Sequence, residues 1–166
     1  MNLNEIIKSE MDSFLLENVE MLPIQKIDSN YDKTDNENYK VNSTYRITVS
    51  DNSTLEMKIN LLRRGKNTTL EGSFESVNDS GERSYNSTND NEPYKVLATV
   101  FDTLKKFVDE YHQKYKDVID KMIFIPFKEE GESDNRRRII YVRYLQRLFP
   151  DYNITNKMIG IKLTRK

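Results

Sequence analysis

The sequence contains no cysteine and no tryptophan, and it contains a single histidine, His112. Without cysteine, the chain has no disulfide framework, no thiolate metal site and no cysteine nucleophile. One histidine is too few for a usual transition-metal site, so we expect no metal. His112 stands among polar and charged residues, and we expect it to be a solvated surface side chain rather than a catalytic base.

The sequence also lacks a long apolar run and a large net charge. No segment approaches the roughly 18 apolar residues of a membrane-spanning helix. The first residues, MNLNEIIKSEMD, are acidic where a secretory signal is basic and then apolar, so we expect no signal-peptide export and no membrane partner. The net charge of −1 by itself indicates no nucleic-acid partner. Abundant asparagine is typical of AT-rich coding and favours a bacteriophage protein, acting in the host cytoplasm or the virion.

At 166 residues the chain has the length of one ordinary domain of about 100–200 residues. No repeat or linker divides it, so we expect residues 1–166 to form a single domain. Residues 3–18 place apolar side chains at helical spacing and predict an N-terminal helix. Residues 28–38 are polar turn formers and predict a loop.

Three segments then alternate apolar and polar side chains, which predicts strands at 43–51, 54–63 and 68–76. The polar residues 51–53 suit a tight hairpin, and 64–67 suit a slightly longer one. Strict alternation indicates a sheet with one face packed and the other wet.

The last part of the chain alternates helix and strand. Residues 78–92 are polar and without period, so they predict a loop. Pro93 suits the first turn of a helix that runs to about Tyr115. A short apolar run at 122–127 predicts a buried central strand, 136–149 predicts an arginine-rich helix, and 158–163 predicts a closing strand. The expected fold is α+β, with a central, mostly antiparallel sheet flanked by helices.

This order of elements, over about residues 40–165, resembles the latter part of the GNAT fold of N-acetyltransferases. It also resembles a group of bacteriophage proteins with a polar segment before a Val-Leu-Ala-Thr-Val helix start and a later Arg-Tyr-rich helix. The matching stretches are residues 87–90, 96–100 and 137–147. The resemblance implies a GNAT-like scaffold and, if the family's activity is kept, a coenzyme A-dependent N-acyltransferase with acetyl-CoA as cofactor.

In that family, backbone amides at the start of the central helix bind the cofactor's pyrophosphate. Here that entrance has no glycine, and Asp90 and Glu92 place negative charge beside it. The family's asparagine and tyrosine on the later helix correspond to Asn135 and to Tyr141 or Tyr144, with a tyrosine as general acid. The alternative is that Tyr144 is a core residue and Tyr141 is half-buried with its hydroxyl in water. The departures at the helix entrance favour a scaffold without a cofactor.

The last 33 residues carry nine basic side chains against two acidic ones, so charge is unevenly distributed. Such a basic surface suits nucleic acid or an acidic protein. Uneven charge also favours oriented docking between copies or with a partner. We therefore expect a non-enzymatic accessory protein that binds a protein or a phage assembly, with nucleic acid and a homo-oligomer as open alternatives. The expected surface joins the long loop to the arginine helix through Ser87, Thr88, Asn89, Asp90, Arg136, Arg137, Arg143 and Arg147.

Overall fold

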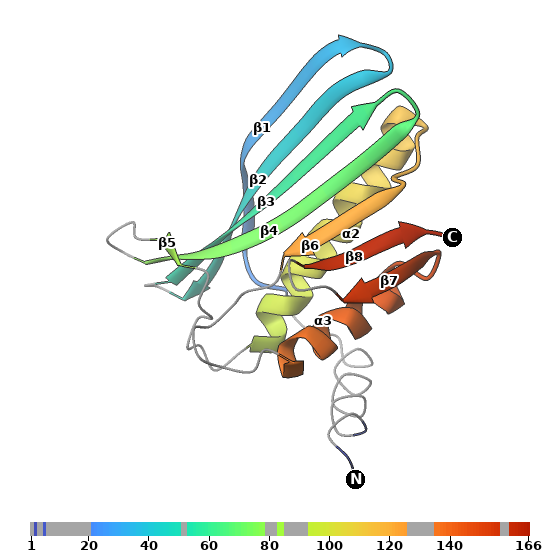
Figure 1. The fold of residues 1–166 in the computed structure, drawn as a ribbon. Helices are drawn as coiled ribbons and strands as arrows, with labels where there is room; N and C mark the ends of the chain where they lie inside the picture. Colours follow the sequence, from blue (N-terminus) through green and yellow to red (C-terminus); the bar gives the residue numbers. More distant parts are fainter. Residues whose placement is uncertain are drawn as a thin grey trace.

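The computed structural model describes residues 2, 5, 21–50, 53–78, 83–84, 93–125, 135–156 and 160–166. Within these residues, strands come first and helices then alternate with strands (Figure 1). In chain order the elements are β1 (Ile24–Asp35), β2 (Asn38–Ser50), β3 (Ser53–Arg64), β4 (Asn67–Asn78), β5 (Arg83–Ser84), α2 (Pro93–Tyr115), β6 (Lys121–Ile125), α3 (Asn135–Leu148), β7 (Tyr152–Asn156) and β8 (Ile161–Arg165).

The strands form one sheet, whose main path runs β1-β2-β3-β4-β6-β8-β7. Neighbours on this path are antiparallel except β4 and β6, which are parallel. The short strand β5 pairs with the end of β4, inside the segment predicted as a loop. The expected α+β class with a mostly antiparallel sheet is therefore confirmed. The order of elements has three additions, because β1 precedes the three predicted strands, β5 follows them, and β7 lies between α3 and β8.

The loop predicted at 28–38 is wrong, because most of it belongs to β1, which pairs antiparallel with β2. Every residue of β1 is exposed, so the strand needs no apolar alternation and its sequence resembles a loop. The turn itself is short. The Asp35 carboxylate accepts hydrogen bonds from the Glu37 amide at 2.8 Å and the Asn38 side-chain amide at 3.0 Å. The Glu37 hydrogen bond is the main cause that lowers the pKa of Asp35.

Strands β2, β3 and β4 confirm the three predicted strands and extend them. Their alternating apolar side chains are buried on one face: Tyr45, Ile47, Leu55, Met57, Ile59, Leu61, Leu70 and Phe74. The β3–β4 turn is tighter than predicted, because Arg64 pairs with Asn67 and leaves two turn residues. The first, Gly65, has a φ of 60°, which glycine adopts without steric cost.

Helix α2 has the predicted bounds and connects the parallel neighbours β4 and β6, lying against one face of the sheet (Figure 1). The apolar stripe of the helix is buried on that face: Val96, Val100, Phe101, Leu104, Phe107, Val108 and Tyr111. The helix ends at Tyr115, and the next residue, Lys116, has a left-handed φ of 53° and donates its amide to the His112 carbonyl at 3.0 Å. This closing bond fixes where the connection to β6 leaves the helix.

The second half of the sheet follows the prediction in part. Met122 and Phe124 of β6 are buried and the two isoleucines between and after them are half-buried, so both faces of this strand are covered. Helix α3 and strand β8 fall within a few residues of the expected segments. Strand β7 was missed because it has only two apolar residues, Tyr152 and Ile154, and lies at the sheet edge.

The N-terminal helix predicted at 3–18 lies outside the described residues except at its start. There the Asn2 side chain accepts a hydrogen bond from the Glu5 amide at 2.8 Å, and the Glu5 carboxylate accepts one from the Asn2 amide at 3.0 Å. Reciprocal bonds of this kind form a capping box at a helix N-terminus. They agree with the predicted starting point of the helix.

Candidate functional site

The exposed large apolar side chains of the described residues gather at one place. Met21, Ile24, Ile27 and Tyr31 are 44%, 43%, 36% and 46% exposed, and all four lie on β1 or just before it. We call these four residues the β1 surface. The chain is held there by two hydrogen bonds, from the Leu22 amide to the Thr99 hydroxyl at 3.0 Å and from the Thr48 amide to the Pro23 carbonyl at 3.0 Å. Clustered apolar exposure at a fixed backbone is typical of a contact surface.

A groove adjoins the β1 surface, between β1–β2 and α2. It consists of two cavities of about 210 Å³ and 120 Å³, which share Lys26, Phe107 and Glu110 in their walls. We call it the β1–α2 groove. The larger cavity is lined by Met21, Ile24, Lys26, Tyr45, Thr99, Asp102, Thr103, Lys106, Phe107 and Glu110. The groove therefore continues the exposed apolar side chains inward to buried ones.

Charges of both signs rim the β1–α2 groove. Lys106 contacts the Asp102 carboxylate at 2.9 Å, and this hydrogen bond is the main cause that raises the pKa of Lys106. The Lys26 ammonium lies 5.5 Å from the centre of the Tyr45 ring, within the range of a cation–π contact. Glu110 stands between the two cavities. An apolar floor with a rim of mixed charge suits a protein surface better than a polyanion.

Tyr111 and Tyr115 line one end of the groove and belong to a cluster of four tyrosines. Tyr31 of β1 and Tyr39 of β2 lie 5.8 Å apart between ring centres, and Tyr115 of α2 lies 5.8 Å and 5.3 Å from them. Tyr111, one helical turn before Tyr115, lies 4.9 Å from it. These contacts join β1, β2 and α2, so Tyr31 is held in place although nearly half of its surface is exposed.

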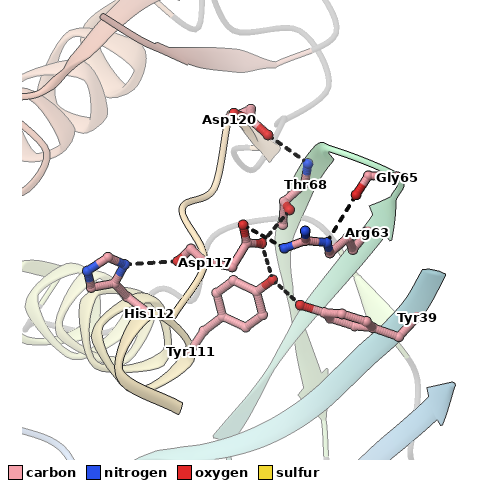
Figure 2. Close-up of polar contacts among 8 residues, drawn as sticks. All are labelled: Tyr39, Arg63, Gly65, Thr68, Tyr111, His112, Asp117 and Asp120. Carbon is pink, nitrogen blue, oxygen red and sulfur yellow. Dashed lines mark hydrogen bonds and ion pairs between the residues drawn. The ribbon is translucent and has the colours of Figure 1, made fainter. Parts of the chain in front are cut away.

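A polar network centred on Asp117 lies beneath these tyrosines (Figure 2). Its carboxylate accepts hydrogen bonds from the hydroxyls of Tyr111 at 2.5 Å and Thr68 at 2.6 Å, and pairs with Arg63 at 2.7 Å. Burial raises the pKa of Asp117, but the two hydroxyls and the Arg63 charge outweigh it, so the pKa stays below its ordinary value. A charged Asp117 ties β3 and β4 to the connection between α2 and β6.

Hydrogen positions in this network follow from its geometry. The Tyr111 hydroxyl gives its only proton to Asp117, so the Tyr39 hydroxyl, 2.6 Å away, must donate to Tyr111. Burial and the neighbouring Asp117 raise the pKa of Tyr111, which keeps the phenol protonated. His112, predicted to be solvated, is exposed but anchored, because its Nδ1–H donates to the Asp117 carbonyl at 2.9 Å. The network thus holds its protons in place, which suits a structural support for the groove.

The two tyrosines proposed from the family resemblance are both buried. Tyr141 and Tyr144 are each 3% exposed. The Tyr141 ring lies 5.8 Å from Phe101 and 6.0 Å from Phe124, and the Tyr144 ring stacks on Phe101 at 5.2 Å. Tyr144 is a core residue, as one interpretation of the sequence had it. The same interpretation predicted that Tyr141 is half-buried. This prediction is wrong, because α3 packs the Tyr141 ring into the aromatic core.

The remaining predicted residues are described only in part. Ser87, Thr88, Asn89 and Asp90 lie outside the described residues. Asn135, Arg136 and Arg137 form the first turn of α3, without described side chains. Arg143 is half-buried and Arg147 is exposed, so these two belong to the outer part of the helix.

Sequence reasoning missed the Asp117 network and the β1 surface. The signal available for the first was Tyr111 and Tyr115 at helical spacing, just before Asp117.

In the part of the chain that the structure describes, no three acidic or histidine side chains come together as metal ligands, and no helix is long and apolar enough to cross a membrane. No protein-family model, curated protein or solved structure matches the chain.

Proposed function

We propose that this chain is a non-enzymatic interaction protein, an accessory protein of the kind bacteriophages encode, that binds a macromolecular partner. The observation that carries the proposal is the gathering of exposed apolar side chains on β1 beside an open groove. A partner that covers Ile24, Ile27 and Tyr31 gains roughly 1 kcal/mol for each side chain, because less than half of each is still exposed and full burial of an exposed apolar side chain is worth about 1.5–3 kcal/mol. The Asp117 network and the four tyrosines hold this surface in one shape, which lowers the entropy cost of binding.

Two surfaces compete for this role. The sequence favours residues 87–90 with α3, whereas the described side chains favour the β1 surface. We predict that the triple variant Ile24→Ser, Ile27→Ser, Tyr31→Ser binds the natural partner at least tenfold more weakly than the wild type. The measurement is quantitative capture from a lysate of the native source, followed by titration of the captured protein.

The matched comparison is a charge reversal on α3, Arg143→Glu with Arg147→Glu. If the β1 surface binds, this variant keeps wild-type affinity, and both variants keep a cooperative melt. Loss of capture by the α3 variant alone would assign binding to the predicted basic surface instead.

One feature of the sheet favours a second function, a coenzyme A-dependent N-acyltransferase. The parallel pairing of β4 with β6 ends at Ser73 and Ile125, while β4 runs on to Asn78. Beyond Ser73 the short strand β5 pairs with β4, so β4 and β6 have their carboxyl ends side by side only up to this point, and carboxyl ends of parallel neighbours commonly border a ligand site. Helix α2 has no acidic residue in its first turn, where the helix dipole favours an anion, and Asp90 and Glu92 stand just before that turn.

Thermal melting with acetyl-CoA separates the two functions. An acyltransferase gains about 2.7 kcal/mol of stability at 100 times the dissociation constant, which a protein of this size shows as a rise of roughly 5–10 °C in Tm. The interaction protein shows no rise at millimolar acetyl-CoA. A saturable rise would remove the non-enzymatic proposal and leave β1 as a surface of an enzyme.

A further inference from the structure

We propose that β1 pairs antiparallel with β1 of a second copy, across a two-fold axis at Ser29, so that two sheets become one. This inference rests on the proposed function, because it names the partner of the β1 surface. In the described residues, β1 has β2 on one side and no strand on the other. A long edge strand with free backbone donors and acceptors is a template for another strand.

The pairing of β1 with β2 defines the ladder positions that a second copy would meet. Lys26 lies opposite Tyr45, Ser29 opposite Ser43 and Tyr31 opposite Val41, so these β1 side chains share the face that α2 covers. The register shifts at Ile27 and Thr34, which have no partner on β2. In an antiparallel pair, opposite residues point to the same face. A two-fold axis perpendicular to the sheet keeps each side chain on its own face. One residue must therefore lie opposite the same residue of the second copy, and we name each register by that residue.

Charge excludes most of the registers. An axis at Asn30 places Lys26 opposite Lys33, and it also places Asp28 opposite Asp32. An axis at Tyr31 places Asp28 opposite Asp35. Axes at the charged residues themselves put like charges face to face. Each of these clashes occurs twice or lies on the axis, and like charges directly opposite each other destabilise a sheet.

The axis at Ser29 is free of such clashes over nearly the whole strand. Ile27 has no ladder position, so it is left out when opposite residues are counted. The axis at Ser29 then places Asp28 opposite Asn30 and Gln25 opposite Asp32, and both pairs can hydrogen-bond. It also places Lys26 opposite the Tyr31 ring, a cation–π arrangement. Like charges remain only on diagonal positions roughly 7–8 Å apart, where water and salt screen them. The charges thus disfavour most of the other registers, and repulsion against alternatives is how a paired edge gains specificity.

A cysteine at the axis tests this register directly, because the natural chain has no cysteine. Opposite Cα atoms in an antiparallel pair lie about 4.5–5.5 Å apart, which a disulfide spans. We expect Ser29→Cys to form a covalent dimer under mild oxidation, seen on a non-reducing gel. Asn153→Cys, exposed on the opposite sheet edge, is the control and stays monomeric. Faster cross-linking by Tyr31→Cys than by Ser29→Cys would overturn the register.

Sedimentation equilibrium tests the dimer in the reduced, cysteine-free chain. Asn30→Asp puts a carboxylate opposite Asp28 of each copy and should weaken dimerisation at least tenfold. Adding Asp28→Asn restores the carboxylate–amide pair and should restore the dimer, which a folding defect would not do. Asn153→Asp has the same chemistry on β7 and should change nothing.

The outcomes separate this inference from the proposed function. A wild type that stays monomeric at all concentrations overturns the dimer, and so does a dimer that neither Ser29→Cys traps nor Asn30→Asp weakens. In either case the proposed function still stands or falls by whether the β1 triple variant loses a foreign partner. A dimer that obeys both tests, in a chain that captures nothing else, assigns the β1 surface to self-association.

Discussion

Replacement of Asp117 by alanine is expected to lower the free energy of unfolding by about 3 kcal/mol, because it leaves a partly buried charge without its partner. The Arg63 guanidinium, 20% exposed, would lose its counterion. The hydroxyls of Tyr111 and Thr68 would lose their acceptor, and Thr68 is fully buried. Urea denaturation measures the loss, and the expected fall in Tm is roughly 6–12 °C.

A matched control is Asp109→Ala. Asp109 pairs with Lys105 at 2.9 Å, a similar distance, but its side chain is 60% exposed. Solvent screens this pair, so the expected cost is about 0.5 kcal/mol or less. Equal costs at the two positions would show that the network adds nothing beyond a surface ion pair.

The effect of Asp117→Ala should also depend on pH. The folded-state pKa of Asp117 lies below its ordinary value of 3.8, so the unfolded chain binds this proton more readily. The contribution of the carboxylate is fully present above about pH 4 and is lost as pH falls through the folded-state pKa. Wild type and variant should therefore differ by a constant amount near neutral pH and converge in acid. A difference that grows in acid would contradict the assignment.

Replacement of Phe124 by alanine is expected to cost about 4 kcal/mol, the usual loss when a buried phenylalanine leaves a cavity. The side chain is 1% exposed on the central strand β6. Its ring lies 5.1 Å from Phe101, 5.6 Å from Phe74 and 6.0 Å from Tyr141, so three elements lose contacts together. Chemical denaturation gives the free energy directly.

Ile125→Ala on the same strand is the comparison. Ile125 is half-buried at the end of β6 and should cost about 1–2 kcal/mol. Similar losses at both positions would mean that the aromatic cluster is not the centre of the core.

Local patterns in the sequence were enough for the elements that bury one continuous face. The bounds of α2 follow from Pro93 and from an apolar stripe at helical spacing, and β2, β3 and β4 follow from alternation. The edge strands β1 and β7 do not have such a pattern. A strand with no buried face, like β1, is held by backbone hydrogen bonds to its neighbour. Backbone hydrogen bonds require no particular order of side chains, so the sequence does not reveal them.

The candidate site depended on contacts that no local pattern contains. Tyr39 and Tyr111, joined at 2.6 Å, are 72 residues apart in the chain, and Thr68 and Asp117 are 49 apart. Tyr141 was expected to be half-buried from the helix alone, and it became a core residue because β6 brought Phe124 to it.

The sequence by itself determined the α+β class, the long helix and the absence of thiol chemistry, because each of these depends on composition or on short-range periodicity. The tertiary structure decided that a polar segment is an edge strand, that four exposed apolar side chains gather on it, and that Asp117 holds a buried network. These features depend on which strands become neighbours, and strand pairing joins residues far apart in the chain.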